Sequence, residues 1–328
     1  MNVRAADIIF SPLDTAWALD EGRYSGALKQ NMVWLCGLLP YGQAAAVMAR
    51  IGKRAVSDSS LWRMAQQTGQ QLGKPATCDL LETTHPSSAE SVGAATKLLS
   101  MDGGMVTIFG EGWKELKVAL VGCVGVDEPD TSDSVPEVHT QALRYSAVLG
   151  DVSAFTPVLL DLARCTHFGE ATRSCITADG APWIWRLADA HFPNSLQILD
   201  WYHARQHLSG AAQALFPNQP AAATTWFQAH TDDLFEGHLT PIVAELERAD
   251  LADPAAYFLT HQARMHYADF RAENYPIGSG SVESEVKQFK HRLDGPGMTW
   301  SRPGVEHMIL IRAAVLDGSF DARWSQAA

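Results

Sequence analysis

The amino-acid sequence predicts an α/β protein whose mixed sheet, three antiparallel strands plus parallel strands, is flanked by helices. A helical N-terminal region and a helical insertion complete this fold class. Residues 1–95 follow the period of amphipathic helices, and from about residue 97 the period becomes that of strands. Further along, strands alternate with helical segments, and residues 204–272 are amphipathic without any strand pattern.

Composition indicates an ordinary soluble globular protein. The 328 residues are 46% hydrophobic and 19% charged, with no apolar run long enough to span a bilayer and no signal-peptide pattern. The five scattered cysteines include no CxxC pair and fit a reducing compartment, so we expect a cytoplasmic protein with no membrane partner. The net charge of −12 opposes a nucleic-acid partner, because such binding depends on Lys and Arg that neutralise phosphates.

Residues 41–72 have the pattern of a helix-turn-helix. One short helix is expected over 41–51, "GKRAV" turns the chain, and Ser57 is a suitable N-cap for a second helix that runs to about Leu72. A helix that enters a DNA groove needs a basic patch, and the alternative is an ordinary helical hairpin with solvated charges. The basic residues of this patch are Arg50, Lys53, Arg54 and Arg63.

Strands and helices then follow in a defined order. "ATKLLSMDGGMVTIFG", "WKELKVALVGCVGV" and "HTQALRYSAVLGD" are expected to form an antiparallel meander, with a Gly-rich turn after the first strand. A helix, "SAFTPVLLDLARCTHFG", leads to the short strand "SCITAD". The helix "PWIWRLADAHF" and the strand-to-helix segment "SLQILDWYHARQHL" come next, so the crossovers are expected to add parallel strands.

Two apolar runs end on the same dipeptide, Asp102-Gly103 after the first strand and Asp179-Gly180 after the fourth. Asp-Gly is a common turn dipeptide, whose glycine lets the chain turn away, so either aspartate alone fits a turn. If the first and fourth strands are neighbours, however, the two carboxylates can meet, and a late helix can add Glu283. Three carboxylates suit Mg²⁺ or Mn²⁺, and two such ions roughly 4 Å apart can promote phosphodiester chemistry.

Glu283 lies in the first turn of its predicted helix, where an acid also complements the helix dipole. Lys287 and Lys290 follow at i+4 and i+7 and share its face, whereas Glu285 points about 200° around the helix. A metal-binding acid beside basic residues that reach phosphates, among them Arg292, suits a nucleic-acid site. The alternative is a surface ion pair.

Three stretches resemble, in order, signature blocks of ISKra-type insertion-sequence transposases, which are relatives of the Mutator-like DDE enzymes. They are "SMDGGMVTIFGEGWKELKVALVG", "TADGAPWIWRLADAHFPNSLQILDWYHARQHL" and "YPIGSGSVESEVKQFKHRLDGPGMTW". The resemblance covers nearly the whole chain and is strongest from about 97 to 318. It implies an RNase H-like fold, transposon-end and target DNA as partners, a homodimer or larger assembly on DNA, and association with the nucleoid.

The resemblance also implies a catalytic triad of Asp102, Asp179 and Glu283 that binds two Mg²⁺ (or Mn²⁺) ions, with Asp200 and His203 as an accessory pair. Asp179 and Asp200 both lie in the second block, so which of them is the second metal ligand stays open. For Asp200 and His203 the alternatives are a helix-start aspartate and a polar core histidine.

The expected organisation is a helical region with the helix-turn-helix over 1–95, catalytic core over 96–210, a helical insertion over 211–272, and C-terminal helices of the core over 273–328. The expected function is a DDE transposase that cuts DNA at transposon ends and joins the 3′-hydroxyl to target DNA by two-metal phosphoryl transfer. One alternative is a non-catalytic, transposase-derived protein that binds DNA. Another is a hydrolase whose paired carboxylates act as general acid and base.

Overall fold

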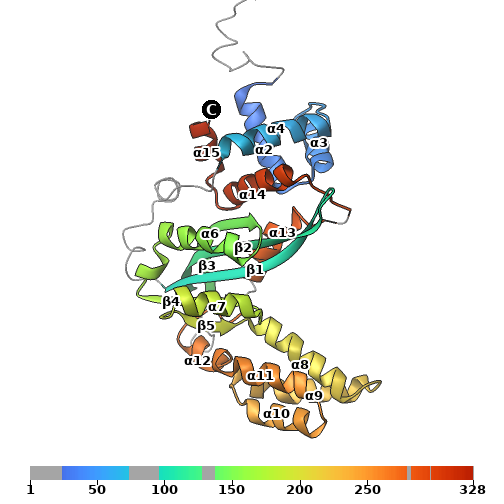
Figure 1. The fold of residues 1–328 in the computed structure, drawn as a ribbon, viewed down its shortest axis with the longest axis vertical. Helices are drawn as coiled ribbons and strands as arrows, with labels where there is room; N and C mark the ends of the chain where they lie inside the picture. The colour runs from blue at the N-terminus through green and yellow to red at the C-terminus, as the bar shows by residue number, and fades with distance from the viewer. Residues whose placement is uncertain (1–23, 74–95, 128–136, 279–281, 296, 328) are drawn as a thin grey trace, which may run out of the picture.

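A computed structural model of the chain describes residues 24–73, 96–127, 137–278, 282–295 and 297–327, without the side chains of 282–286 and 327. The sheet lies in the middle of an elongated molecule (Figure 1). The N-terminal and C-terminal helices gather at one end, and a second group of helices forms the other end.

The sheet has five strands in the order β3-β2-β1-β4-β5. β1 (Thr96–Ile108), β2 (Gly112–Asp127) and β3 (Glu137–Leu149) form an antiparallel meander. β4 (Arg173–Ala178) pairs parallel with β1, and β5 (Leu196–Leu199) pairs parallel with β4. The predicted α/β class, with three antiparallel strands followed by parallel ones, is therefore confirmed.

The expectation that Asp102 closes the first strand is wrong, because β1 continues to Ile108. Gly103 and Gly104 lie within the ladder, opposite residues of β2. The chain turns later, over 109–111, where Gly110 and the first residue of β2, Gly112, have positive φ angles of 76° and 74°. Those two glycines adopt a backbone conformation that other residues rarely tolerate.

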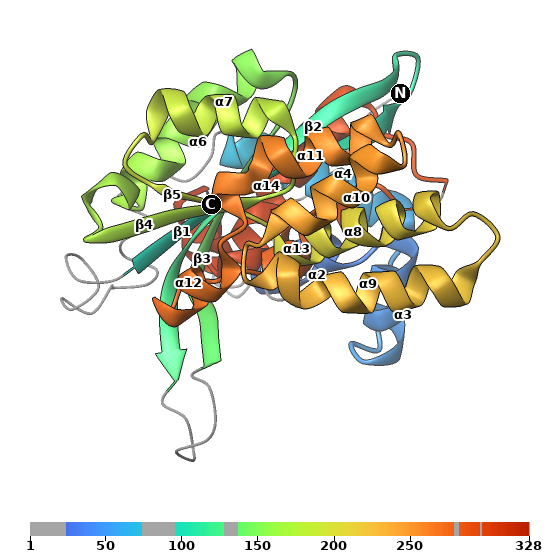
Figure 2. The same ribbon diagram turned by 90° about the horizontal axis from the view of Figure 1, so that it is seen from below.

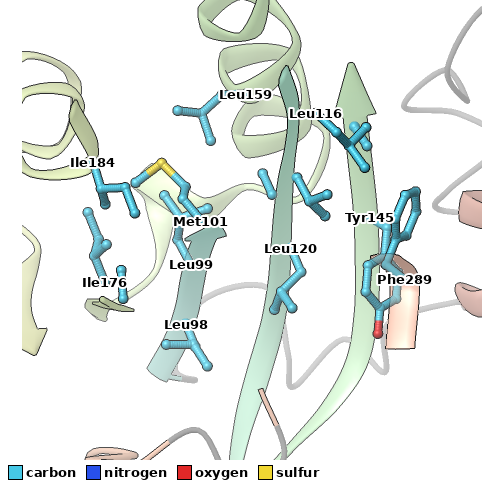
Figure 3. Packing of buried hydrophobic residues seen from close by; sticks show 14 of the residues in the cluster. Leu98, Leu99, Met101, Leu116, Leu120, Tyr145, Leu159, Ile176, Ile184 and Phe289 are labelled. Atoms are coloured by element: carbon cyan, nitrogen blue, oxygen red, sulfur yellow. The ribbon is translucent and has the colours of Figure 1, made fainter. Parts of the chain in front are cut away.

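Helices cover both faces of the sheet. α6 (Val152–Cys165) and α7 (Pro182–His191) pack on one face, where Met101 lies with Leu159 and Ile184 (Figure 3). α13 (Val282–His291) packs on the other face, where Phe289 stacks on Tyr145 at 6.0 Å between ring centroids. Alternate residues of β1 therefore face different helices.

The N-terminal helices are α2 (Gly26–Leu38), α3 (Tyr41–Arg50) and α4 (Asp58–Leu72). The Ser57 hydroxyl accepts a hydrogen bond from the Ser60 N–H at 3.2 Å and caps α4, as its position in the sequence predicts. α2 and α4 pack against α14 (Arg302–Leu316) and α15 (Phe320–Ala327) from the opposite end of the chain, and α3 packs on α2 and α4. α14 also packs on β3, so it connects the sheet to the N-terminal helices.

The second group of helices begins where β5 ends. Its members are α8 (Trp201–Leu215), α9 (Pro220–Phe235), α10 (Leu239–Arg248), α11 (Ala252–His261), the 3₁₀ turn η3 (Gln262–Arg264) and α12 (Tyr267–Ala272). Another 3₁₀ turn, η2 (Phe168–Glu170), lies earlier in the chain, before β4. α8 and α9 lie side by side (Figure 2). None of the described helices is both long and apolar enough to cross a membrane.

The described cysteines are in two different states. Cys36, Cys123 and Cys175 are free thiols, whereas Cys165 takes part in a disulfide.

Candidate active site

Asp102 and Asp179 fall at one register position of two neighbouring parallel strands. The last β1–β4 pair sets Leu99 opposite Ile176, and each strand reaches its aspartate three positions later. Residues at equal register in neighbouring strands point to the same face of a sheet. Continued past that last pair, the register places both carboxylates on the face covered by α13.

Asp200 falls at the same position one strand further along. β4 and β5 pair Ala178 with Leu199, one position before Asp179 and Asp200 respectively. The Asp200 N–H donates to the Ala178 carbonyl at 2.9 Å, which continues the pairing to the aspartate itself. Three aspartates from three strands are thereby aligned across the sheet.

The Asp102 carboxylate is half-buried and ion-paired with Lys290 of α13. The Lys290 ammonium donates to Asp102 Oδ2 at 2.7 Å and to the Gly103 carbonyl at 3.0 Å. Burial raises the pKa of Asp102, the Lys290 charge lowers it, and the Asp179 carboxylate raises it again. The effect of Asp179 on Asp102 agrees with the neighbouring positions that the strand register gives the two aspartates.

Gly104 makes room for Lys290. A Cβ atom at Gly104 would lie 2.9 Å from Lys290 Cδ, closer than real Cβ contacts allow. This glycine therefore lets α13 reach Asp102, and its place in an extended strand follows from that approach.

Asp179 closes β4, as predicted, and its Oδ1 accepts a hydrogen bond from the Ala181 N–H at 2.9 Å at the start of α7. The chain bends at Gly180 between β4 and α7, as expected of an Asp-Gly dipeptide, but Gly180 is not among the glycines with positive φ, so the bend itself does not require a glycine. A Cβ there would lie 3.0 Å from Tyr257 Cε2 and 3.3 Å from His261 Nε2. Gly180 instead admits side chains of α11 next to Asp179.

Asp200 is a helix-start aspartate. It is 5% exposed, and its Oδ1 accepts a hydrogen bond from the His203 N–H at 2.8 Å, which caps α8. The His203 imidazole lies against that of His207, with the two Nε2 atoms 3.3 Å apart. Capping accounts for an aspartate at position 200 without a metal.

Rings of α8 and α11 form a wall beside Asp179, which no pattern in the sequence predicted. Tyr257 stacks on His207, with centroids 3.6 Å apart and an interplanar angle of 11°, and it contacts His261 at 4.9 Å. Burial lowers the pKa of His261, and Arg264 and the two α8 imidazoles lower it further, to about 4 in total. The only signal in the sequence is the i,i+4 spacing within each helix.

The segment before α13 is anchored along the ends of β4 and β5. The Thr177 hydroxyl donates to the Pro276 carbonyl at 3.2 Å, and the Trp201 N–H donates to the Ile277 carbonyl at 3.0 Å. Glu283 lies in α13, but its side chain is outside the described part of the structure. Among the described side chains, no three His, Cys, Asp or Glu residues gather so as to hold a metal.

The predicted DNA-contacting residues fall into three groups. The first group is exposed and consists of Lys287 of α13 and four residues in or near the turn between α3 and α4, namely Arg50, Lys53, Arg54 and Arg63. Lys290 is held by Asp102. The prediction for Arg292 is wrong, because its side chain is 2% exposed, donates to the Cys36 carbonyl at 2.8 Å, and lies between the rings of Tyr41 and Trp300.

Among solved structures, the Drosophila P element transposase strand transfer complex is similar to this chain with a TM-score of 0.34 and 13% sequence identity, over 96% of this chain and 84% of that chain. No protein-family model and no curated protein matches the sequence. A similarity at this level carries no argument, so the function has to be inferred from the residues of this chain.

Proposed function

We propose that this protein is a DDE transposase with an RNase H-like core, which cuts DNA at transposon ends and joins the freed 3′-hydroxyl to target DNA. The observation that carries the proposal is the alignment of Asp102 and Asp179 on one face of neighbouring parallel strands. The strand order β3-β2-β1-β4-β5, with a meander followed by parallel strands, is consistent with such a core.

The residues present fit a divalent cation. Asp102 and Asp179 supply carboxylate oxygens, and Mg²⁺ is usually bound by one or two carboxylates together with substrate phosphates. Two Mg²⁺ or Mn²⁺ ions held there would activate the attacking oxygen and stabilise the leaving oxygen of the phosphodiester.

Glu283 is the proposed third ligand. Positions 283 and 290 lie on one face of α13, about two turns apart, and Lys290 reaches Asp102 from that face. The start of the connection to α13 is fixed beside Asp200 by the hydrogen bond to the Ile277 carbonyl. Only a few residues separate Ile277 from Glu283, so both ends of the helix are confined to this face of the sheet.

For the second ligand we favour Asp179 over Asp200. Asp200 is deeply buried and its side chain caps α8, whereas Asp179 is only half-buried and lies opposite Asp102 in the register. Asp200 then orients α8, and His203 extends from the first turn of that helix toward His207.

Basic residues are proposed to hold the DNA. The exposed arginines and lysine of the α3–α4 turn would contact backbone phosphates, which position a helix-turn-helix on DNA. Lys290 neutralises Asp102 in the absence of a cation and could hold a phosphate once that charge is replaced. Assembly on DNA as a homodimer or larger, near the nucleoid, belongs to the same proposal.

The test is strand cleavage of a plasmid that carries the genomic DNA flanking the coding sequence on both sides. We expect Mg²⁺-dependent nicking by the wild type and none by Asp102→Asn. Nicking by the wild type that does not exceed that of Asp102→Asn would refute catalysis. DNA binding that survives in both proteins without cleavage would instead favour the non-catalytic DNA-binding protein.

A further inference from the structure

Tyr257 of α11 lies against Gly180, the residue that follows Asp179. Its ring has two aromatic neighbours, His207 of α8, on which it stacks, and His261, one turn later in α11. A ring fixed by two neighbours directs its hydroxyl to one place.

That place is the backbone next to Asp179. A Cβ at Gly180 would lie 3.0 Å from Tyr257 Cε2 and 3.3 Å from the Tyr257 hydroxyl oxygen. Burial raises the pKa of the Tyr257 phenol, and the carboxylates of Asp179 and Asp200 raise it further. The hydroxyl therefore stays protonated and is a hydrogen-bond donor near neutral pH.

This donor has no acceptor among the described residues. The Tyr257 hydroxyl oxygen is buried and makes no hydrogen bond to them. A buried, unsatisfied hydroxyl costs about 1–3 kcal/mol, and such groups in a native structure call for an explanation. Within the described residues Asp179 accepts one hydrogen bond, at Oδ1, so its Oδ2 can accept another.

We propose that Tyr257 is a positioning residue, whose hydroxyl donates a hydrogen bond to the Asp179 carboxylate when that carboxylate binds a divalent cation. This inference rests on the proposed function. Carboxylates that bind metals are commonly oriented by hydrogen bonds from neighbouring residues, and loss of such a partner typically weakens metal binding or activity about 10- to 100-fold. The helical insertion thereby contributes to the site through α11.

The test compares Tyr257→Phe, which keeps the ring stack and removes only the hydroxyl, with Tyr267→Phe. Tyr267 is 0% exposed, and its hydroxyl also lacks a hydrogen-bond partner among the described residues, so this control reports the loss of a buried hydroxyl alone. Binding of Mn²⁺ is measured by electron paramagnetic resonance without DNA, and the Mg²⁺ concentration for half-maximal plasmid nicking is measured separately. Thermal unfolding of the metal-free proteins checks their folding.

We expect Mn²⁺ binding to weaken on the order of tenfold in Tyr257→Phe and to stay unchanged in Tyr267→Phe. The half-maximal Mg²⁺ concentration should rise in parallel, and the metal-free melting temperature should not fall, because the deleted hydroxyl had no partner. Equal Mn²⁺ affinity in the wild type and Tyr257→Phe, with binding still lost in Asp179→Asn, would overturn this inference alone. A wild type that binds no Mn²⁺ at all would overturn the metal site, and this inference with it.

Discussion

The two Asp-Gly sites of this protein have the same sequence and different surroundings. Asp102-Gly103 lies in the middle of β1, where Gly104 leaves room for the flexible side chain of Lys290. Asp179-Gly180 lies at the end of β4, where glycine leaves room for a stacked ring and an imidazole of α11. One site is bordered by a charge and the other by aromatic groups.

At neither site is a glycine needed for the backbone conformation of the dipeptide. Gly103 and Gly104 are extended within a ladder, and Gly180 has no positive φ. In both places the missing side chain lets another element come close to an aspartate. Each of the two aligned carboxylates therefore has a side chain of a helix packed next to it, as expected of an active site.

The largest expected effect tests whether the two aspartates are equivalent. Asp102→Asn and Asp179→Asn should each lower the nicking rate about a thousandfold, since metal catalysis supplies several kcal/mol and each 1.4 kcal/mol is tenfold. Plasmid nicking under single-turnover conditions measures both. A large loss at one site and none at the other would break the comparison.

Asp200→Asn is the matched control for this pair. Asparagine caps helices about as well as aspartate, so the free energy of unfolding should hardly change. We expect nicking to fall much less than in Asp179→Asn. The reverse ranking would make Asp200 the second ligand.

The next effect concerns the imidazoles, which border Asp179 and not Asp102. The pKa of His261 is about 4, below its ordinary value of 6.5, so its stability contribution is complete above pH 6.5. As the pH falls from 6.5 to 4, the unfolded chain takes up the proton before the folded protein does. This lowers the free energy of unfolding by up to about 3 kcal/mol. Urea unfolding across this range should show the loss in the wild type and a shallower one in His261→Gln.

Alanine at the two glycines should separate the sites by the stiffness of their neighbours. Gly180→Ala forces a Cβ against the stacked ring of Tyr257 and should cost about 1–3 kcal/mol of unfolding free energy. Gly104→Ala meets only a flexible lysine and should cost under about 1 kcal/mol. In the double variant with Tyr257→Ala the cost of Gly180→Ala should shrink, and additive costs would show that the ring is not the obstacle.

The smallest effect is at Lys290. Removal of the ammonium in Lys290→Gln leaves Asp102 without its ion-pair partner, so a cation no longer has to displace that charge. A pair worth about 1 kcal/mol predicts Mn²⁺ binding that is about fivefold tighter. Weaker binding, measured by calorimetry, would show that Lys290 supports the metal site and does not compete with it.

Much of the fold could be predicted from the sequence, because local signals agreed with tertiary structure. Ser57 starts α4, and the short apolar run before Asp179 is β4. The end of β1 could not be placed, since a glycine pair reads the same in a turn and in a strand that another element approaches. Only the packed side chain of Lys290 distinguishes the two cases.

The alignment of Asp102 with Asp179 could be anticipated from strand order, but the wall of rings could not. Tyr257 and His261 sit on a helix far along the chain, and no spacing connects them to Gly180. The prediction that Arg292 contacts DNA was wrong for a related reason. A basic residue on a polar helix reads as exposed, whereas here the Cys36 carbonyl and two rings bury it.

The proposed function requires that Asp102 and Asp179 bind a divalent cation between them. A crystal soaked with Mn²⁺ and measured at the manganese absorption edge tests this most directly. We predict an anomalous peak in contact with a carboxylate oxygen of each aspartate, at about 2.0–2.2 Å. No ion at this position, with the two carboxylates turned away from each other, would contradict the account.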